Sequence, residues 1–356
     1  MNSKHRAVSR IYLGYLIEHN GLALLGILCS LITAVSGVAL LAVSGWFISA
    51  AALAGLSVAA AHGFNYFTPA AAVRGLSISR TAGRYAERLL NHEVTFRVIA
   101  QLRADFFQRL ADKAVGNGKH LDTHDASSKL LEDIERTEKL HLGALIPLAV
   151  SVAVALLYIA VLVVFIGSDA WFFLPSLLMC VAVLPWLYWR ALSRDEDGYN
   201  QTLALQWKRS SATFSSLRTL LLFQRLPAST NALNVGFKSA AQDETALASK
   251  QFKLQMLVNL NGEIWLVLAL AISLIGYAQD QLSGALVFML ILLTLGVQEA
   301  LFVAVPAWSA LGQGMAAIGR VNALVDKPDV VDSRHLLTGS LAIGFEKLGF
   351  TYDGQK

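Results

Sequence analysis

Four basic side chains recur every four residues in one stretch of the sequence, namely Arg80, Arg84, Arg88 and His92. If the stretch is helical, residues four apart lie on one side of the helix and form a basic stripe. A helix starting near Pro69 would place Arg80 about 16 Å and His92 about 35 Å along its axis. Arg80 and Arg84 would then lie at hydrocarbon depth, where a charge costs roughly 2.5–3.5 kcal/mol and usually faces a cavity or a partner.

A basic stripe of this kind suits an anionic ligand, and haem b is one ligand that fits it. The propionates of a haem favour arginine, here Arg84 and Arg88, and its iron takes an imidazole, which makes His92 the candidate metal ligand. The alternative is structural, with the arginines and the histidine at the cytoplasmic interface and paired with Glu87 and Glu93. The sequence alone leaves both interpretations open.

Two carboxylates also fall inside apolar stretches, Glu263 and Glu299. Together with Arg80 they are candidates for a substrate path, in which a carboxylate would bind an amine. The alternative is that they pair with the arginines and serve structure only. Pro306 is expected to kink the last apolar stretch, either as a gate or as a static bend. No metal-ligand spacing, hydrolytic triad or phosphate-cradling G-x-x-x-x-G-K-[ST] loop occurs, so we expect no catalytic residue and no ATP hydrolysis by this chain alone.

The composition indicates that much of the chain is solvated by lipid. Of 356 residues, 55% are hydrophobic and 15% are charged, whereas soluble domains carry roughly 25% charged residues. The two cysteines, Cys29 and Cys180, lie in apolar runs, which argues against a disulfide framework. Five apolar runs have the length of about 20 residues that crosses a bilayer as a helix. They are residues 21–48, 143–167, 170–189, 257–277 and 285–311.

A sixth crossing is expected between residues 50 and 92, with its outer turn anywhere between Gly55 and Pro69. In this stretch Thr68 is the predicted N-cap and Pro69 the predicted first-turn proline. The outer connections, near 53–69, 168–169 and 278–283, contain no Lys or Arg, whereas the inner segments hold nearly all of them. This distribution follows the positive-inside rule. It predicts six transmembrane helices with both ends of the chain in the cytoplasm.

The longer inner segments are themselves predicted to be helical. Residues 87–113 and 203–253 are rich in helix-forming residues and would extend tens of ångströms into the cytoplasm. Residues 340–352 instead alternate and favour strands, as expected at the start of a soluble domain. The predicted organisation is a cytoplasmic segment (1–20), a transmembrane domain (21–315), a linker (316–340) and the beginning of a nucleotide-binding domain (341–356).

This predicted architecture resembles the type I ABC exporter fold, an all-α membrane fold of six transmembrane helices with long cytoplasmic extensions. In that family the strand before the first nucleotide loop ends in a Phe-x-Tyr signature, which Phe350-Thr351-Tyr352 matches. The resemblance implies that Tyr352 stacks on the adenine of ATP, the flat aromatic face serving as the platform. It also implies coupling helices, which dock into the nucleotide-binding domain, near residues 120–128 and 214–224.

More specific motifs resemble the CydC-type subunits of bacterial CydDC transporters. They are LAVSGWFISA (41–50), FNY (64–66), PAAAVRG (69–75) and SRTAGRYAERLLNHEVTFR (79–97). The resemblance implies a heterodimer with a CydD-like half-transporter in the lipid of the bacterial inner membrane, and no nucleic-acid partner. It further implies export of small thiols such as cysteine and glutathione, support of cytochrome bd assembly and bound haem. A lipid or drug exporter without haem is one alternative, and a membrane haem-binding or sensor protein without transport is another.

Overall fold

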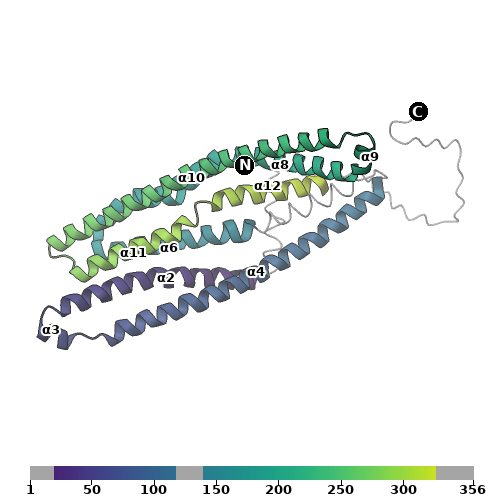
Figure 1. The fold of residues 1–356 in the computed structure, drawn as a ribbon. Helices are drawn as coiled ribbons and strands as arrows, with labels where there is room; N and C mark the ends of the chain where they lie inside the picture. The colour runs from purple at the N-terminus through teal and green to yellow at the C-terminus, as the bar shows by residue number, and fades with distance from the viewer. Residues whose placement is uncertain (1–19, 118–138, 326–356) are drawn as a thin grey trace, which may run out of the picture.

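The computed structural model describes residues 20–117 and 139–325, which form an elongated helical bundle without strands in these two ranges (Figure 1). The elements in chain order are α2 (Asn20–Ala54), α3 (Val58–Gly63), α4 (Phe67–Asn117), η1 (His141–Leu145), α6 (Ile146–Ile166), η2 (Gly167–Phe173), α7 (Leu174–Leu178), η3 (Met179–Val183), α8 (Leu184–Ser215), α9 (Leu217–Leu222), α10 (Leu226–Ala278), α11 (Gly284–Phe302) and α12 (Ala307–Val325). Elements η1 and η3 are π-helical and η2 is a 3-10 helix. The predicted all-α class is thus observed in the described part of the chain.

Four helical stretches in the described ranges have the length and apolar character needed to cross a membrane. They are Gly21–Ala54, His141–Ser215, Leu226–Ala278 and Gly284–Gly319. The second contains both α6 and α8, because the elements from η1 to α8 follow one another without a break. Gly167, at the end of α6, has a φ of +57°, which glycine adopts without steric cost. Helix α4 is not among the four, since its arginines interrupt its apolar runs. The six crossings therefore remain a prediction.

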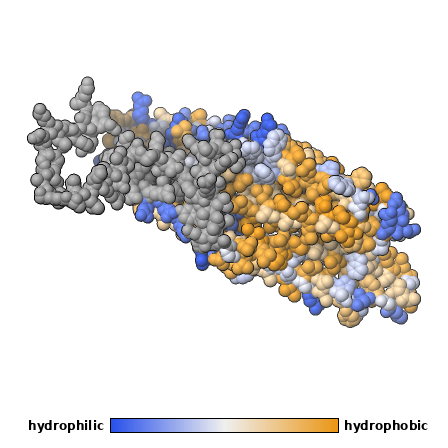
Figure 2. Space-filling view, turned by 180° about the vertical axis from the view of Figure 1, so that it is seen from behind, coloured by the Kyte–Doolittle hydropathy of each residue, from blue (hydrophilic) through white to orange (hydrophobic). Residues whose placement is uncertain are grey.

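The surface of the bundle carries an apolar band. Figure 2 shows hydrophobic side chains covering much of one face, with hydrophilic side chains gathered toward the ends of the molecule. Large apolar side chains point outward from several helices, including Leu24 on α2, Leu156 and Val164 on α6 and Val267 on α10. Apolar surface on this scale is solvated by lipid rather than by water in a membrane protein.

The turn between the first two long helices lies where the sequence placed it, because α2 ends at Ala54 and α4 begins at Phe67. The residue that caps the start of α4 differs from the predicted one. The side chain of Asn65 accepts hydrogen bonds from the backbone N–H groups of Phe67 (3.1 Å) and Thr68 (3.4 Å). The prediction that Thr68 is the N-cap is wrong, since the carboxamide oxygen of Asn65 already satisfies the first free N–H groups of the helix.

The long helical extensions are present at the other end of the bundle. Helix α4 continues through the predicted 87–113 segment, and α8 and α10 lie side by side with the short helix α9 between them (Figure 1). Helix α9 falls inside the range predicted for the second coupling helix, whereas the range predicted for the first lies outside the described residues. The last apolar stretch breaks at Val303–Pro306 into α11 and α12, as the proline predicted. Helix α12 runs on without interruption past residue 316.

Small and hydroxylated residues let α2 approach its two neighbours closely. On the α4 side, Ser36 and Ser79 share a hydrogen bond of 3.0 Å between their hydroxyl oxygens, and a Cβ built on Gly83 would lie 2.7 Å from the hydroxyl oxygen of Thr33. On the α11 side, a Cβ on Gly296 would lie 3.2 Å from the Cα of Val38. Close backbone approach at small residues is the usual basis of helix association in lipid.

An aromatic cluster fixes the centre of the bundle. Tyr158 of α6 is buried, and its hydroxyl shares a 2.9 Å hydrogen bond with that of Thr294 on α11. Its ring meets those of Trp265 on α10 and Phe173 on η2 edge to face, with centroids 5.4 and 6.1 Å apart. Such pairs add roughly 0.5–1.5 kcal/mol each beyond the burial of their area. The cluster therefore joins α6, η2, α10 and α11 at the centre of the bundle.

Candidate functional site

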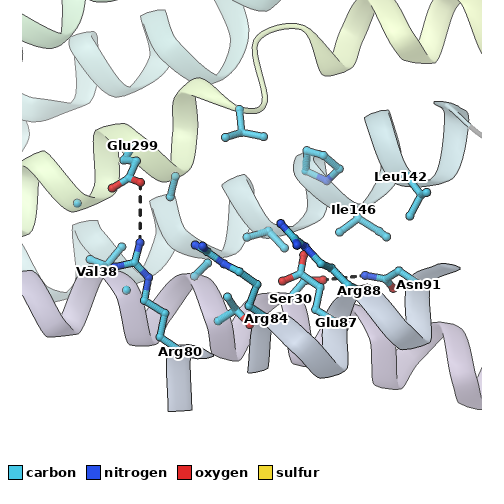
Figure 3. Close-up of a pocket in the computed structure, with 18 residues that line it drawn as sticks. Ser30, Val38, Arg80, Arg84, Glu87, Arg88, Asn91, Leu142, Ile146 and Glu299 are labelled. Carbon is cyan, nitrogen blue, oxygen red and sulfur yellow. Dashed lines mark hydrogen bonds and ion pairs between the residues drawn. The ribbon is translucent and has the colours of Figure 1, made fainter. Parts of the chain in front are cut away.

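A cavity of about 390 Å³ lies between α2, α4, α6 and α11, at the centre of Figure 3. Five of its lining side chains are charged, four from α4 and one from α11. They are Arg80, Arg84, Glu87, Arg88 and Glu299. The volume falls within the range of about 300–1,000 Å³ typical of small-molecule sites. The cavity thus concentrates charge inside a bundle whose outer surface is apolar.

One pair of these charges is engaged across the cavity. A terminal nitrogen of Arg80 lies 3.9 Å from a carboxylate oxygen of Glu299, which links α4 to α11 (Figure 3). The Arg80 side chain is 33% exposed and that of Glu299 is 71% exposed. A pair that remains this accessible to solvent is weak and can exchange partners. The structure therefore pairs Glu299 with one arginine, as the structural interpretation of the sequence anticipated.

The other charged residues of the cavity have no such partner. Among the described residues, Arg84, Arg88 and Glu87 form no ion pair or hydrogen bond. Figure 3 shows the three side chains reaching into the space between the helices. Two free guanidinium groups at i and i+4 lie about 5–6 Å apart at their Cβ atoms. This spacing presents two adjacent donors of the type that binds carboxylate or phosphate in a two-point manner.

A buried hydrogen bond closes one end of the cavity. The side-chain amide of Asn91 donates to the hydroxyl of Ser30 at 3.1 Å, and that hydroxyl donates to the carbonyl of Gly26 at 3.0 Å. A Cβ on Gly26 would lie 2.1 Å from the carboxamide oxygen of Asn91, so a larger residue there would displace the Asn91 side chain. The remaining oxygen of Asn91 is buried and accepts no hydrogen bond. Asn91 and Ser30 are residues of the site that the arginine spacing did not reveal.

Apolar and small residues complete the lining. They are Ala34, Gly37, Val38, Leu142, Ile146, Pro147, Val150, Gly296, Ala300 and Val303, with Thr33 as a further hydroxyl. The wall contains no cysteine, histidine or aromatic ring. In the described ranges no group of three or more His, Cys, Asp or Glu side chains is placed to hold a metal ion. The chemistry available to the cavity is therefore the binding of charged and polar groups.

The predicted haem residues separate into two faces of α4. Arg84 and Arg88 line the cavity, but His92 does not, because residues four apart on a helix drift about 40° around its axis at each step. The imidazole of His92 is exposed and meets the ring of Phe96 edge to face, with centroids 6.0 Å apart. Of the predicted substrate path, Arg80 and Glu299 line the cavity, whereas Glu263 lies exposed on α10 outside it. Tyr352 lies outside the described residues.

A second buried polar cluster, which the sequence analysis did not predict, joins α8 to α12. Glu196 of α8 is almost fully buried and accepts hydrogen bonds from the hydroxyl of Ser309 at 2.8 Å and the amide of Gln313 at 2.5 Å, both on α12. A serine and a glutamine four residues apart are too common on helices to indicate a buried cluster. Glu196 lies among other charged residues in the sequence, so nothing marks it as buried. The cluster ties α8 to the helix that follows the Pro306 break.

Comparison with known proteins identifies the relatives of the chain. No protein-family model matches it. The chain is 29% identical over 353 residues to the glutathione/L-cysteine transport system ATP-binding/permease protein CydC of Escherichia coli, an alignment that covers 97% of the chain and 60% of the relative. The corresponding CydC of Haemophilus influenzae is 26% identical over 337 residues, covering 94% of the chain and 58% of the relative.

A CydD protein aligns over a shorter region. The glutathione/L-cysteine transport system protein CydD of Bacillus subtilis is 30% identical over 176 residues, which covers 49% of the chain and 29% of the relative. The chain thus spans about three-fifths of the length of its CydC relatives. The chain is homologous over nearly its whole length to CydC ABC transport proteins and over about half of its length to a CydD protein, and it corresponds to their permease-like portion.

Proposed function

We propose that the chain is the membrane-spanning part of an ABC exporter subunit that moves cysteine- or glutathione-type thiols across a bacterial inner membrane. It would act as half of a heterodimer with a CydD-like partner and support cytochrome bd assembly. ATP would bind to a nucleotide-binding domain that starts near residue 341, with Tyr352 against the adenine. Closure of that domain would reach the membrane through α9 and the first coupling helix.

The observation that carries the proposal is the charged cavity in a chain homologous to thiol transporters. Three arginines and two glutamates line it, so the cavity has one net positive charge. A compound with carboxylate and ammonium groups is matched by such a set, because each of its charges finds a partner of opposite sign. A pathway for lipids or apolar drugs would instead expose a mainly apolar wall, so the charged lining supports the thiol transporter over that alternative.

The Val303–Pro306 break supports a transport role for the last two helices. It lies beside the cavity, because Val303 is part of the lining and α12 begins immediately after the break. Glu196 anchors α12 to α8, so movement of the α8–α10 pair would pull on the helix that follows the break. Rigid helices joined at a short irregular segment are the usual elements of hinge motion.

The test is transport by the full-length pair reconstituted in vesicles. Radiolabelled glutathione or cysteine should accumulate in inside-out vesicles only with ATP and magnesium. Accumulation should fall to background when ATP is replaced by a non-hydrolysable analogue. Equal accumulation with and without ATP would refute the transport proposal and favour the alternative of a haem-binding or sensor protein without transport.

Haem b is a second candidate ligand, supported by one exposed face of α4. Tyr85, Leu89, His92 and Phe96 follow the spacing i, i+4, i+7 and i+11, so they form one stripe, and all four are exposed. Apolar and aromatic side chains beside a histidine suit a porphyrin ring, and Arg88 lies on the adjacent turn. A haem held by His92 would lie on this stripe rather than within the cavity, so of the two predicted propionate partners Arg88 is the nearer and Arg84 faces the cavity instead.

Bound haem would supply an iron centre on the stripe, while the chain would contribute the imidazole of His92 and the charge of Arg88. A difference spectrum of the purified full-length pair tests the assignment. His92→Ala should abolish the Soret band of added haem, and Phe96→Ala should only weaken it. An unchanged spectrum in the His92 variant would refute this role for the residue.

A further inference from the structure

Among the described residues, the lining of the cavity between α2, α4, α6 and α11 contains no soft group of the kind that binds sulfur selectively. Proteins bind a thiol selectively through a metal ion, through another thiol, or through soft contacts with methionine and aromatic rings, whereas arginines and hydroxyl groups bind carboxylates as readily as they bind sulfur. None of the eighteen lining residues is cysteine, methionine, histidine or aromatic. Of the two cysteines, Cys29 does not line the cavity and Cys180 is buried in the core elsewhere. The lining therefore offers a thiol only ordinary contact.

The free charges of the cavity are instead matched to the ends of an amino-acid or peptide backbone. Arg80 is paired with Glu299, which leaves Arg84 and Arg88 as the arginines of the cavity that have no partner among the described residues. Glu87 is the free carboxylate between them in the sequence. Two guanidinium groups and one carboxylate on the same two turns of α4 are the complement of two carboxylates and one ammonium group.

Glutathione carries that set of groups at neutral pH, since its two carboxyl groups are ionised and its amino group is protonated. The volume of the cavity corresponds to about thirteen water molecules, which suits a ligand of tripeptide scale. Cysteine has only one carboxylate and would leave one of the two arginines unpaired. Charge matching thus ranks a dicarboxylate peptide above a single amino acid.

We propose that this cavity selects its substrate by the two carboxylates and the ammonium group of a small γ-glutamyl peptide, and not by its thiol. Arg84 and Arg88 bind the two carboxylates and Glu87 binds the ammonium group. The cavity makes no selective contact with the thiol, so peptides with a blocked or missing sulfur are equally good ligands. This inference rests on the proposed transport function and specifies the substrate class of its cavity.

The test uses the full-length pair in detergent and in vesicles with four probes. They are glutathione, γ-glutamyl-alanyl-glycine, S-methylglutathione and the dimethyl ester of glutathione. Binding is followed by competition against radiolabelled glutathione or, where that does not bind, by direct thermal stabilisation. The alanine and S-methyl peptides should bind within about threefold of glutathione, whereas the diester should lose on the order of hundredfold to ten-thousandfold, because it removes two charge-assisted contacts.

Variants assign the effect to named side chains. Arg88→Gln should lower the affinity for γ-glutamyl-alanyl-glycine on the order of tenfold to hundredfold. Arg74→Gln is the matched control, because Arg74 is exposed on the same helix and does not line the cavity. It should leave binding unchanged. A loss of more than tenfold with the alanine peptide, or equal binding of the diester, would overturn the inference.

The outcomes separate the inference from the function on which it rests. If glutathione is moved with ATP but the alanine peptide neither binds nor moves, transport stands and selection by charge fails. If the peptides bind in the expected order but none is moved with ATP, the binding chemistry stands and the transport proposal fails. If none of the four probes binds, both fail.

Discussion

The Arg80–Glu299 pair provides a quantitative test of how the cavity is held together. The perturbation is a double-mutant cycle with Arg80→Gln, Glu299→Gln and both changes combined. At the observed separation of 3.9 Å, the Coulomb energy is about 1 kcal/mol in water and about 4 kcal/mol at an effective dielectric constant of 20. Because the side chains are 33% and 71% exposed, solvent screening places the net value near the lower figure.

The expected coupling free energy is therefore about 0.5–1 kcal/mol. The assay is equilibrium unfolding of the purified protein in mixed micelles, with all four proteins of the cycle measured at two salt concentrations. The coupling should shrink at high salt, because a pair with this exposure is screened. A coupling above about 3 kcal/mol, or one that does not respond to salt, would refute the view that the pair is open to solvent and able to exchange partners.

The same variants, compared with Arg88→Gln, separate the role of Arg80 from that of Arg88. Arg80 is already engaged by Glu299, so Arg80→Gln should weaken glutathione binding less than Arg88→Gln does. Glu299→Gln releases Arg80 and makes the cavity more positive, so binding of an anion should be unchanged or tighter. If Arg80→Gln weakened binding as much as Arg88→Gln, the distinction between engaged and free guanidinium groups would be wrong.

Three further outcomes test the fold around the cavity. Gly45→Ala should destabilise the bundle by about 1–3 kcal/mol in the same unfolding assay, because its Cβ would lie 2.9 Å from the carbonyl oxygen of Phe288; Gly75→Ala, which meets no atom within 4 Å, should be neutral or slightly stabilising. Glu196→Ala should cost about 1–3 kcal/mol, since the buried hydroxyl of Ser309 and the half-buried amide of Gln313 lose their acceptor, and Glu196→Gln should cost less; equal costs would show that the hydrogen bonds are unimportant. Arg218→Cys should resist an impermeant thiol reagent added outside intact cells, whereas Gln281→Cys should react, and the opposite pattern would reverse the predicted topology.

The sequence predicted the helical class and most boundaries because apolar runs and turn residues act locally. The Pro306 break, the turn before Phe67 and the extension of α4 all follow from the properties of the residues at those points. The capping residue of α4 was missed for the opposite reason. Thr68 before Pro69 has the right type, but Asn65 reaches the free N–H groups of the same turn, and which of two capping residues prevails depends on the backbone path.

The site was only partly predictable, because it depends on which helices are neighbours. The spacing of Arg80, Arg84 and Arg88 placed them on one side of a helix without saying what that side faces. The partners from other helices, Glu299 and Ser30, lie far away in the sequence and are brought close by packing. His92 shares the four-residue spacing, yet over three steps the drift around the helix carries it out of the cavity.

The position of α4 explains how a helix with so many charges can belong to an apolar bundle. Its arginines exclude it from the helices that qualify as membrane spans by composition. In the structure, however, α2 and α11 form a cavity with α4, and Arg80 and Arg84 line this cavity, Arg80 half-buried and Arg84 exposed. The close approach that makes this possible depends on glycine and serine along α2, where larger side chains would push α4 away. The small residues of α2 and the arginines of α4 therefore depend on each other. The small residues allow the cavity to form, the cavity gives the charged side chains a polar environment, and the charged side chains determine which ligands the cavity can bind.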